Sequence, residues 1–444
     1  MAKQIKNKKP ANQANKSEIK RNRYLIAFPV IAFLIKMITM GNIQGGGWLG
    51  ADGENYFKGV DGLYADGLFS KADILNYWPA GYPILLWLLV LISVSKFVYL
   101  ISFIQSIFFA FATYYLTKNI SKTGAAWLAV PASFFITFNP TLSLSTLAVG
   151  YEAPVAACFM MVLGVIISSK LNQGKSPYIS AIYAGGWVTL ASFMQPRYLL
   201  AGFIIFIIWG FSWATKKQGM QISAIAIVVM IFSPVALISR NVVAIDKTTI
   251  STNLGVTMAI GAGDETKGGY KRTGPEVPCT SATPGSTVTD NQKVICVLKW
   301  YATNPIKTVK LAIYKSEYFW SPWSGPLAEG TMARNPWLKI SPTQSIIKNQ
   351  SGVEFVSGPI GKLISWLWII FQVGFLFYGF VSFRKADPVS KLIADSALAT
   401  VVISWLVSIG TIGDHRFRIP TMGLSLVLQV VAIWKIKNKM AKAL

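Results

Sequence analysis

The sequence predicts an all-α polytopic membrane protein, and three observations lead to this fold class. First, 53% of the 444 residues are hydrophobic and only 14% are charged, whereas soluble domains carry about 25% charged residues. Second, the apolar residues form blocks of the length that crosses a bilayer, about 20 residues. Third, basic residues gather between the blocks, as the positive-inside rule describes. We therefore expect about ten transmembrane helices, at Tyr24–Met40, Phe97–Leu116, Gly124–Phe138, Tyr151–Ser168, Tyr178–Met194, Tyr198–Ala214, Gln221–Ile238, Ile360–Phe383, Leu392–Ile409 and Ile419–Ile436.

The net charge of +24 is explained by this topology and does not indicate nucleic-acid binding. Basic residues crowd the segment before Tyr24 and the segment after Trp434, and they also mark the short connections at 118–123, 170–177, 215–220 and 384–391. Placing these segments in the cytoplasm puts both termini inside, in a plasma or inner membrane whose anionic lipids attract them. The outer segments are then 41–80, 139–150, 195–197, 239–359 and 410–418.

One apolar stretch is too short to cross the membrane. It spans Tyr82–Ser93, whereas a crossing takes at least about 17 residues. Counting it as a crossing would also place every later basic connection on the outer side. We therefore predict a juxtamembrane helix half sunk in the outer interface; the rival topology has eleven crossings and a weak charge bias.

The chain is expected to have four parts. These are a basic cytoplasmic tail at 1–23, an N-terminal transmembrane module at 24–238 that includes a catalytic outer loop at 41–80, a large outer-face loop domain at 239–359, and C-terminal helices with a basic tail at 360–444. The loop domain is expected to be mixed in structure. Thr248–Gly261 alternates weakly, which favours a strand, and Asn304–Phe319 has helical spacing.

Cysteine positions fit an oxidising outer compartment. Cys279 and Cys296 lie in the same outer loop, so we expect them to form a disulfide. Neither a His nor a second Cys pair accompanies them, so the pattern does not indicate a metal site, and a divalent metal has no support elsewhere in the sequence. Cys158 lies inside an apolar helix as a small apolar residue.

Acidic residues at the outer ends of apolar blocks are candidates for chemistry, because burying charge in a membrane is costly. Asp52 and Glu54 follow the first block, where a carboxylate could act as general base on an attacking hydroxyl or amine; the alternative is a solvated loop acid. Glu152 begins another block and could hold an acceptor or raise the pKa of a neighbouring acid. Its alternative role is favourable electrostatics at a helix N-terminus.

Basic residues form two further outer groups. Arg197 lies in a tight turn between apolar blocks, against the usual charge bias, and Arg suits bidentate phosphate recognition. His415, Arg416 and Arg418 share a second turn, where the two arginines predict an anion site. His415 is the only histidine, and a structural role is the simpler interpretation.

Carboxylates and guanidinium groups at one outer face suit a reaction with an anionic leaving group and a nucleophile that must lose a proton. Glycosyl transfer from a polyprenyl phosphate is such a reaction, since Arg would stabilise the departing phosphate. The polyprenyl chain would lie in a groove between helices, reached from the bilayer.

Several motifs, in order along the chain, resemble the GT-C glycosyltransferases, a superfamily of polyprenyl-phosphate-dependent enzymes. Within this superfamily the sequence looks similar to bacterial relatives of the protein mannosyltransferases and to the lipid A aminoarabinose transferase, glycosyltransferase family 39. The matching stretches are Asp52 with Tyr56, Pro79–Pro83, Thr252–Gly255 with Gly261–Gly263 and Gly268–Tyr270, Asn304–Pro305 with Lys315 and Trp320, and Arg416–Pro420.

This resemblance implies a GT-C-like fold and a hexosyltransferase with Asp52 as base. It also implies a polyprenyl-phosphate-sugar donor, no nucleotide sugar, inversion at the anomeric carbon, and a lipid, glycan or protein acceptor. One departure is that Gly53 separates Asp52 from Glu54, whereas the family often has adjacent acids. The base is therefore open between these two, with Asp52 preferred.

Two other functions remain open from the sequence. A transporter or flippase for a lipid-linked or anionic solute needs polar groups near the bilayer midplane, where this chain has little besides Lys36. An O-antigen ligase or polymerase would also use outer arginines, but with a pyrophosphate-linked donor.

Overall fold

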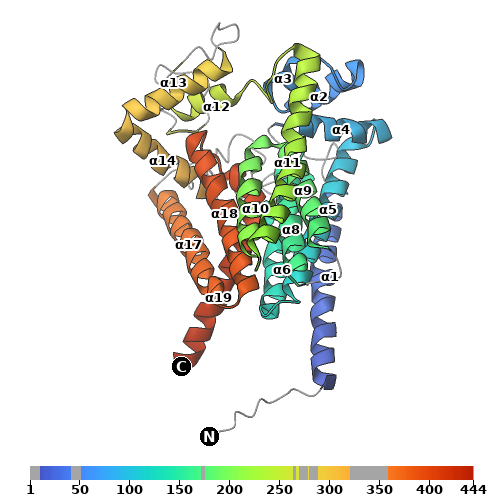
Figure 1. Ribbon diagram of the computed structural model, residues 1–444, viewed down its shortest axis with the longest axis vertical. Helices are drawn as coiled ribbons and strands as arrows, with labels where there is room; N and C mark the ends of the chain where they lie inside the picture. The colour runs from blue at the N-terminus through green and yellow to red at the C-terminus, as the bar shows by residue number, and fades with distance from the viewer. Residues whose placement is uncertain are drawn as a thin grey trace.

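The computed structural model describes residues 11–41, 52–171, 176–263, 267–269, 279, 289–320 and 359–443 of the chain. Within these ranges the regular elements are helices, and none is a strand. Ten helices form an elongated bundle (Figure 1): α1 (Ala11–Gly41), α5 (Phe97–Ile120), α6 (Ala129–Phe138), α8 (Glu152–Lys170), α9 (Pro177–Met194), α10 (Leu199–Phe211), α11 (Lys216–Ile245), α17 (Pro359–Arg384), α18 (Pro388–Gly410) and α19 (Ile419–Ala443).

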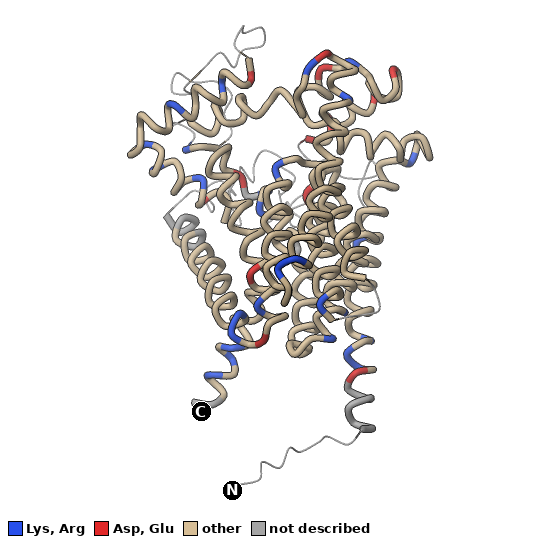
Figure 2. The backbone as a smooth tube through the Cα atoms, viewed as in Figure 1, with Lys and Arg blue, Asp and Glu red and all other residues tan. Residues whose placement is uncertain are grey.

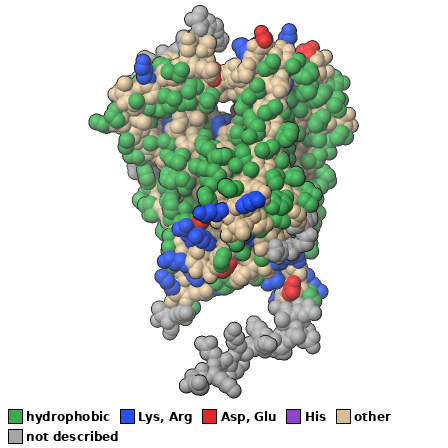
Figure 3. All heavy atoms as spheres, in the orientation of Figure 1, with side chains coloured by type: hydrophobic (Ala, Val, Ile, Leu, Met, Phe, Trp, Pro, Cys, Tyr) green, Lys and Arg blue, Asp and Glu red, His purple; other side chains and the backbone are tan. Residues whose placement is uncertain are grey.

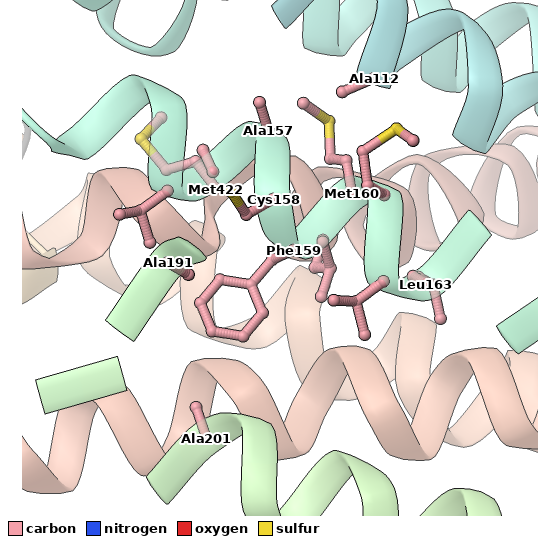
Figure 4. Packing of buried hydrophobic residues seen from close by; sticks show 14 of the residues in the cluster. Ala112, Ala157, Cys158, Phe159, Met160, Leu163, Ala191, Ala201 and Met422 are labelled. Atoms are coloured by element: carbon pink, nitrogen blue, oxygen red, sulfur yellow. The ribbon is translucent and has the colours of Figure 1, made fainter. Parts of the chain in front are cut away.

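Helix α8 is the centre of the bundle. Nearly all of its residues are buried, because α5, α9 and α19 pack around it. Small residues allow the close approach: Ala157 and Cys158 lie among side chains from these neighbours (Figure 4), and Gly423 of α19 faces Met160. An apolar helix without a polar face is what burial inside a membrane bundle requires.

Six described helices are long and apolar enough to cross a membrane, namely α5, α8, α11, α17, α18 and α19. A seventh span results if α6 and the short turns after it are one element, bent by 56°. The expected number of about ten is therefore not confirmed. The blocks at 124–138 and 198–214 yield helices of only 10 and 13 residues, α6 and α10, which are shorter than the bilayer core.

The two ends of the bundle differ in their content of basic residues. Lys and Arg gather at the end where α1 begins and α19 finishes (Figure 2). There Lys118, in the last turn of α5, donates a 2.8 Å hydrogen bond to Asn22 of α1. The opposite end carries the shorter helices: α2 (Gly53–Asp66), α3 (Asp73–Tyr77), α4 (Gly81–Ile92), α12 (Leu254–Gly261), α13 (Asp290–Thr303) and α14 (Pro305–Trp320).

The short apolar stretch after α3 is a helix, α4, of 12 residues. Its first residue, Gly81, packs against the backbone carbonyl of Phe193, and a Cβ at this position would overlap that oxygen. Leu91 and Ile92 at its other end are exposed. Both its length and its exposed apolar end fit the predicted juxtamembrane helix.

The part of the loop domain that the structure describes is helical. The strand expected in Thr248–Gly261 is wrong, because the part of this segment from Leu254 onward forms the helix α12. The backbone N–H groups of Gly255 and Val256, in its first turn, donate to the Asp290 carboxylate at 2.8 and 3.3 Å. The helix expected at Asn304–Phe319 is confirmed as α14. A disulfide joins Cys279 to Cys296 of α13.

Candidate functional site

Arg416 lies among three carboxylates that come from distant parts of the chain. Its Nη1 atom is paired with the Asp52 carboxylate. Its Nε atom is 3.7 Å from Asp414 and 4.0 Å from Glu152. Asp52 precedes α2, and Glu152 begins α8. Asp414 comes directly before the 3-10 turn η5 (His415–Arg418), and Arg416 lies within it. The fold therefore brings three segments together.

Local backbone structure directs these side chains. Asp414 is the N-cap of η5 and accepts a 3.0 Å hydrogen bond from the Arg416 backbone N–H, which fixes the turn. Asp52 occupies the N-cap position of α2, yet its side chain makes no capping hydrogen bond. Its carboxylate is therefore available to Arg416, although an Asp at this position usually caps its own helix.

Exposure distinguishes the three acids. The Asp52 side chain is 18% exposed, against 2% for Glu152 and 1% for Asp414. Asp52 also lines the large cavity described below. It is therefore the carboxylate of this cluster that an incoming group can reach, whereas Glu152 and Asp414 surround the guanidinium from inside the protein.

Arg197 supplies a second guanidinium to the same cavity. It lies in η3 (Pro196–Tyr198), and its guanidinium carbon is 3.7 Å from the centre of the Phe417 ring. Within the described residues its Nε and Nη1 atoms are buried without a hydrogen-bond partner. Buried donors of this kind are costly unless a ligand satisfies them, so Arg197 is the cation of the site with capacity for an anion.

Two of the predicted site residues lie away from the cavity, and the side chain of a third is not described. Arg418 is buried, donates a 2.6 Å hydrogen bond to the Trp320 carbonyl oxygen and does not line the cavity. Glu54 is exposed on the first turn of α2 and does not line it either. The backbone of His415 belongs to η5, and its side chain lies outside the described residues.

The cavity has a volume of about 800 Å³ and three kinds of wall. One end holds the ionised groups of Asp52, Arg197 and Arg416. A second wall is apolar and comes from α10 and α11, through Leu199, Leu200, Phe203, Ile227, Met230 and Ile231. The third wall carries aromatic, hydroxyl and amide groups from the α3 and α12–α13 regions, through Tyr77, Trp78, Ser251, Asn253, Thr257 and Asn291.

Two buried tyrosines complete the ionised end. Tyr151 precedes α8 and lines the cavity, and burial followed by the charge of Glu152 raises its pKa to about 12. Burial and then the charge of Asp52 likewise raise the pKa of Tyr56. Both phenols therefore stay protonated at neutral pH and present O–H donors.

Two basic residues that fix segments next to the site are not among the candidates from the sequence. Arg240, in the last turns of α11, donates hydrogen bonds to oxygen atoms of Leu68, Ser70, Leu75, Asn76 and Asn241, and so fixes the segment around α3. The signal was available, because Arg240 is a positive charge at an outer helix end, as Arg197 is. From the sequence, Lys315 of α14 is notable only as part of the family resemblance. It donates hydrogen bonds to backbone carbonyl oxygens before η5.

No group of three or more His, Cys, Asp and Glu residues in the described ranges is arranged to hold a metal ion. The carboxylates of Asp52, Glu152 and Asp414 are arranged around the guanidinium of Arg416.

No protein-family model and no curated protein matches this sequence. Solved structures that overlap with it are oligosaccharyltransferases from Archaeoglobus fulgidus. One is AglB in complex with an inhibitory peptide and a dolichol-phosphate (TM-score 0.48, 13% identity, 95% of this chain and 51% of that chain). Another is a complex with Zn and sulfate (TM-score 0.49, 13% identity, 93% and 49%). The chain thus spans about half the length of these archaeal enzymes.

Proposed function

We propose that this chain is a membrane glycosyltransferase of the GT-C type. It transfers a sugar from a polyprenyl-phosphate donor to an acceptor on the outer face of the membrane, with inversion. The observation that carries the proposal is the composition of a single cavity. A reachable carboxylate, Asp52, lies beside two guanidinium groups, and an apolar wall extends from them along α10 and α11.

The donor fits the two halves of this cavity. Its phosphate would satisfy the buried Nε and Nη1 donors of Arg197, which have no hydrogen-bond partner in the described residues. Its polyprenyl chain would follow the apolar wall, whose α11 side begins at Ile227. Apolar lining with a few convergent polar groups is the usual composition of a small-molecule site.

The reaction then needs one displacement. The acceptor oxygen or nitrogen attacks the anomeric carbon, the bond from that carbon to the phosphate oxygen breaks, and polyprenyl phosphate leaves with the electron pair. Asp52 takes the proton of the attacking group. Arg197 and Arg416 stabilise the charge that develops on the phosphate, and a single displacement inverts the anomeric centre.

Arg416 has a double role in this proposal. Its pairing with Asp52 holds that carboxylate in place at the cavity that both residues line. The buried carboxylates of Glu152 and Asp414 fix the guanidinium in place. Preorganised charges of this kind need no rearrangement during the reaction.

The test is Asp52→Asn, assayed with a synthetic polyprenyl-phosphate hexose. Loss of a general base costs about 10²- to 10⁴-fold in rate, while the variant should still bind the donor, because Arg197 is intact. The matched control is Glu54→Gln, which alters an exposed acid two residues away and should retain activity. A fully active Asp52→Asn enzyme would refute the assigned mechanism.

A second candidate differs in the donor. Two guanidinium groups line the same cavity, and this number also suits a pyrophosphate, as in the ligase or polymerase alternative. Supplying the purified chain with monophosphate and pyrophosphate donors that carry the same sugar separates the two. Our proposal expects turnover of the monophosphate donor.

A further inference from the structure

Helix α14 carries apolar side chains on two opposite faces. Leu311, Phe319 and the stem of Lys315 form its buried face. On the other side Ile306, Val309 and Ile313 are 85%, 61% and 53% exposed. Their spacing of three and four residues places them on one face of the helix, so the exposed face is a continuous aliphatic strip rather than scattered single residues.

The preceding helix repeats this arrangement. Ile295 and Leu298 of α13 are exposed, three residues apart and therefore on one side, while Val297 is buried against Met258 and Ala259 of α12. Helices α13 and α14 follow each other directly through Asn304. Five large aliphatic side chains thus face outward from one helical corner.

The corner lies where the membrane bundle ends. Figure 1 shows α13 and α14 projecting beyond the bundle on one side while α4, the short helix with exposed Leu91 and Ile92, projects on the other. Helix α14 also contacts α17, whose Leu363 and Leu367 are exposed. Hydrophobic side chains are visible on the outward side of this corner and down the adjoining bundle (Figure 3). The strip therefore continues the lipid-facing surface of the spanning helices.

The charges beside the strip are basic. Lys299 of α13 and Lys307 and Lys310 of α14 are exposed, and the acidic residues of the two helices, Asp290 and Glu317, are only partly exposed. Lysines next to aliphatic residues are typical of helices that lie in the membrane interface, where the stems bury and the ammonium groups reach the headgroups.

We propose that the α13–α14 corner is a membrane-docking element that lies in the outer-leaflet headgroup layer of an anionic bilayer. Ile306, Val309 and Ile313 enter the acyl boundary, and the three lysines contact lipid phosphates. This inference is independent of the proposed glycosyl transfer. Its structural consequence concerns the cavity: α12 packs on α13 and lines the cavity with Thr257, so docking holds that wall at a fixed depth.

The test measures depth directly, on the full chain in phosphatidylcholine vesicles. Ile306→Cys and Ile313→Cys are labelled with bimane, and brominated phosphatidylcholine is the quencher. Asp61→Cys on α2, also at an exposed position, is the matched control. The native free cysteine, Cys158, is buried, so the unsubstituted chain gives the labelling background. We expect lipid quenching at both α14 positions at least severalfold above that at Asp61→Cys.

Aqueous iodide provides the opposing measurement. If iodide quenches Ile306→Cys as strongly as Asp61→Cys, the strip faces water and the proposal is overturned, whether the strip is bare or reserved for a protein partner. The lysines are tested by adding phosphatidylglycerol to the vesicles. Lipid quenching should increase for the native lysines but not in a Lys299→Gln, Lys307→Gln, Lys310→Gln background, and an equal increase in both would refute the electrostatic part.

Discussion

Lys315 of α14 donates a 2.9 Å hydrogen bond to the carbonyl oxygen of Thr411, five residues before Arg416. It also donates to the Ile409 carbonyl oxygen and to the Tyr301 hydroxyl, both at 2.9 Å. These bonds satisfy the carbonyl groups at the C-terminal end of α18, which otherwise lack partners. The outer helices are thereby fastened to the turn that presents Arg416 to Asp52.

Replacing Lys315 by Met should destabilise the fold by roughly 1–3 kcal/mol, because backbone carbonyls lose their donor. The effect should depend on pH. Burial lowers the pKa of Lys315 from 10.5 to about 7, so between these values the unfolded chain holds a proton that the folded chain has lost. The stability that the native lysine contributes therefore rises with pH.

Thermal unfolding in detergent, from about pH 6 to about pH 9, measures this dependence. The difference between the native chain and Lys315→Met should widen across the range. A difference that stays constant, or narrows, would show that Lys315 does not lose its proton in the folded state.

Arg240→Met should lower stability by roughly 2–4 kcal/mol, since a buried guanidinium that serves several oxygen atoms is removed. Arg240→Lys should recover only part of the loss, because an ammonium group cannot reproduce the planar fork of donors. Differential scanning calorimetry on the purified chain gives both values. Full recovery by lysine would mean that charge alone, and not geometry, holds the segment around α3.

Arg197 and Arg418 should behave differently although both are arginines of the predicted anion site. Arg197→Gln should raise the KM for the donor about 10- to 100-fold with little change in Tm, because its guanidinium contacts the Phe417 ring and the cavity. Arg418→Gln should lower Tm and leave the KM of the folded fraction near its native value, because Arg418 bonds to Trp320. If Arg418→Gln raised the KM for the donor and Arg197→Gln lowered the Tm, the donor phosphate would be assigned to Arg418 instead.

Removing the disulfide with Cys279→Ser and Cys296→Ser should weaken the α12–α13 unit. The residues are 17 positions apart, and closing a loop of about 15 residues is worth about 3 kcal/mol in the chain-entropy model. Hydrogen exchange should accelerate in α13 and remain unchanged in α8, which lies in the bundle centre. Acceleration throughout the chain would instead indicate that the disulfide supports the whole fold.

Sequence reasoning identified most of the bundle, because long apolar blocks and basic connections report directly on a membrane environment. It failed where a distant contact determines local structure. The segment 254–261 is helical with its N-terminus capped by Asp290, some 35 positions away, and no local pattern contains that contact. The number of spans is not confirmed for a related reason, since α6 ends after 10 residues and the chain then bends.

The candidate site shows the same division. Asp52, Glu152, Arg197 and Arg416 were found because charges at the ends of apolar blocks are conspicuous, and the fold brings them together. Glu54 and Arg418 were grouped with them by proximity in sequence. Residues two apart on a helical turn point in different directions, so neither neighbour shares the cavity.

The central position of α8 has a consequence for biosynthesis. Met160 of α8 packs against Gly423 of α19, a helix that is synthesised much later than α8. This side of α8 therefore lacks its protein neighbour while the ribosome is still making the segments between them. Nascent α8, with Glu152 at its first turn, must be shielded during that interval by lipid or by the insertion machinery. Truncation before α19 should therefore yield a product that quality-control proteases degrade.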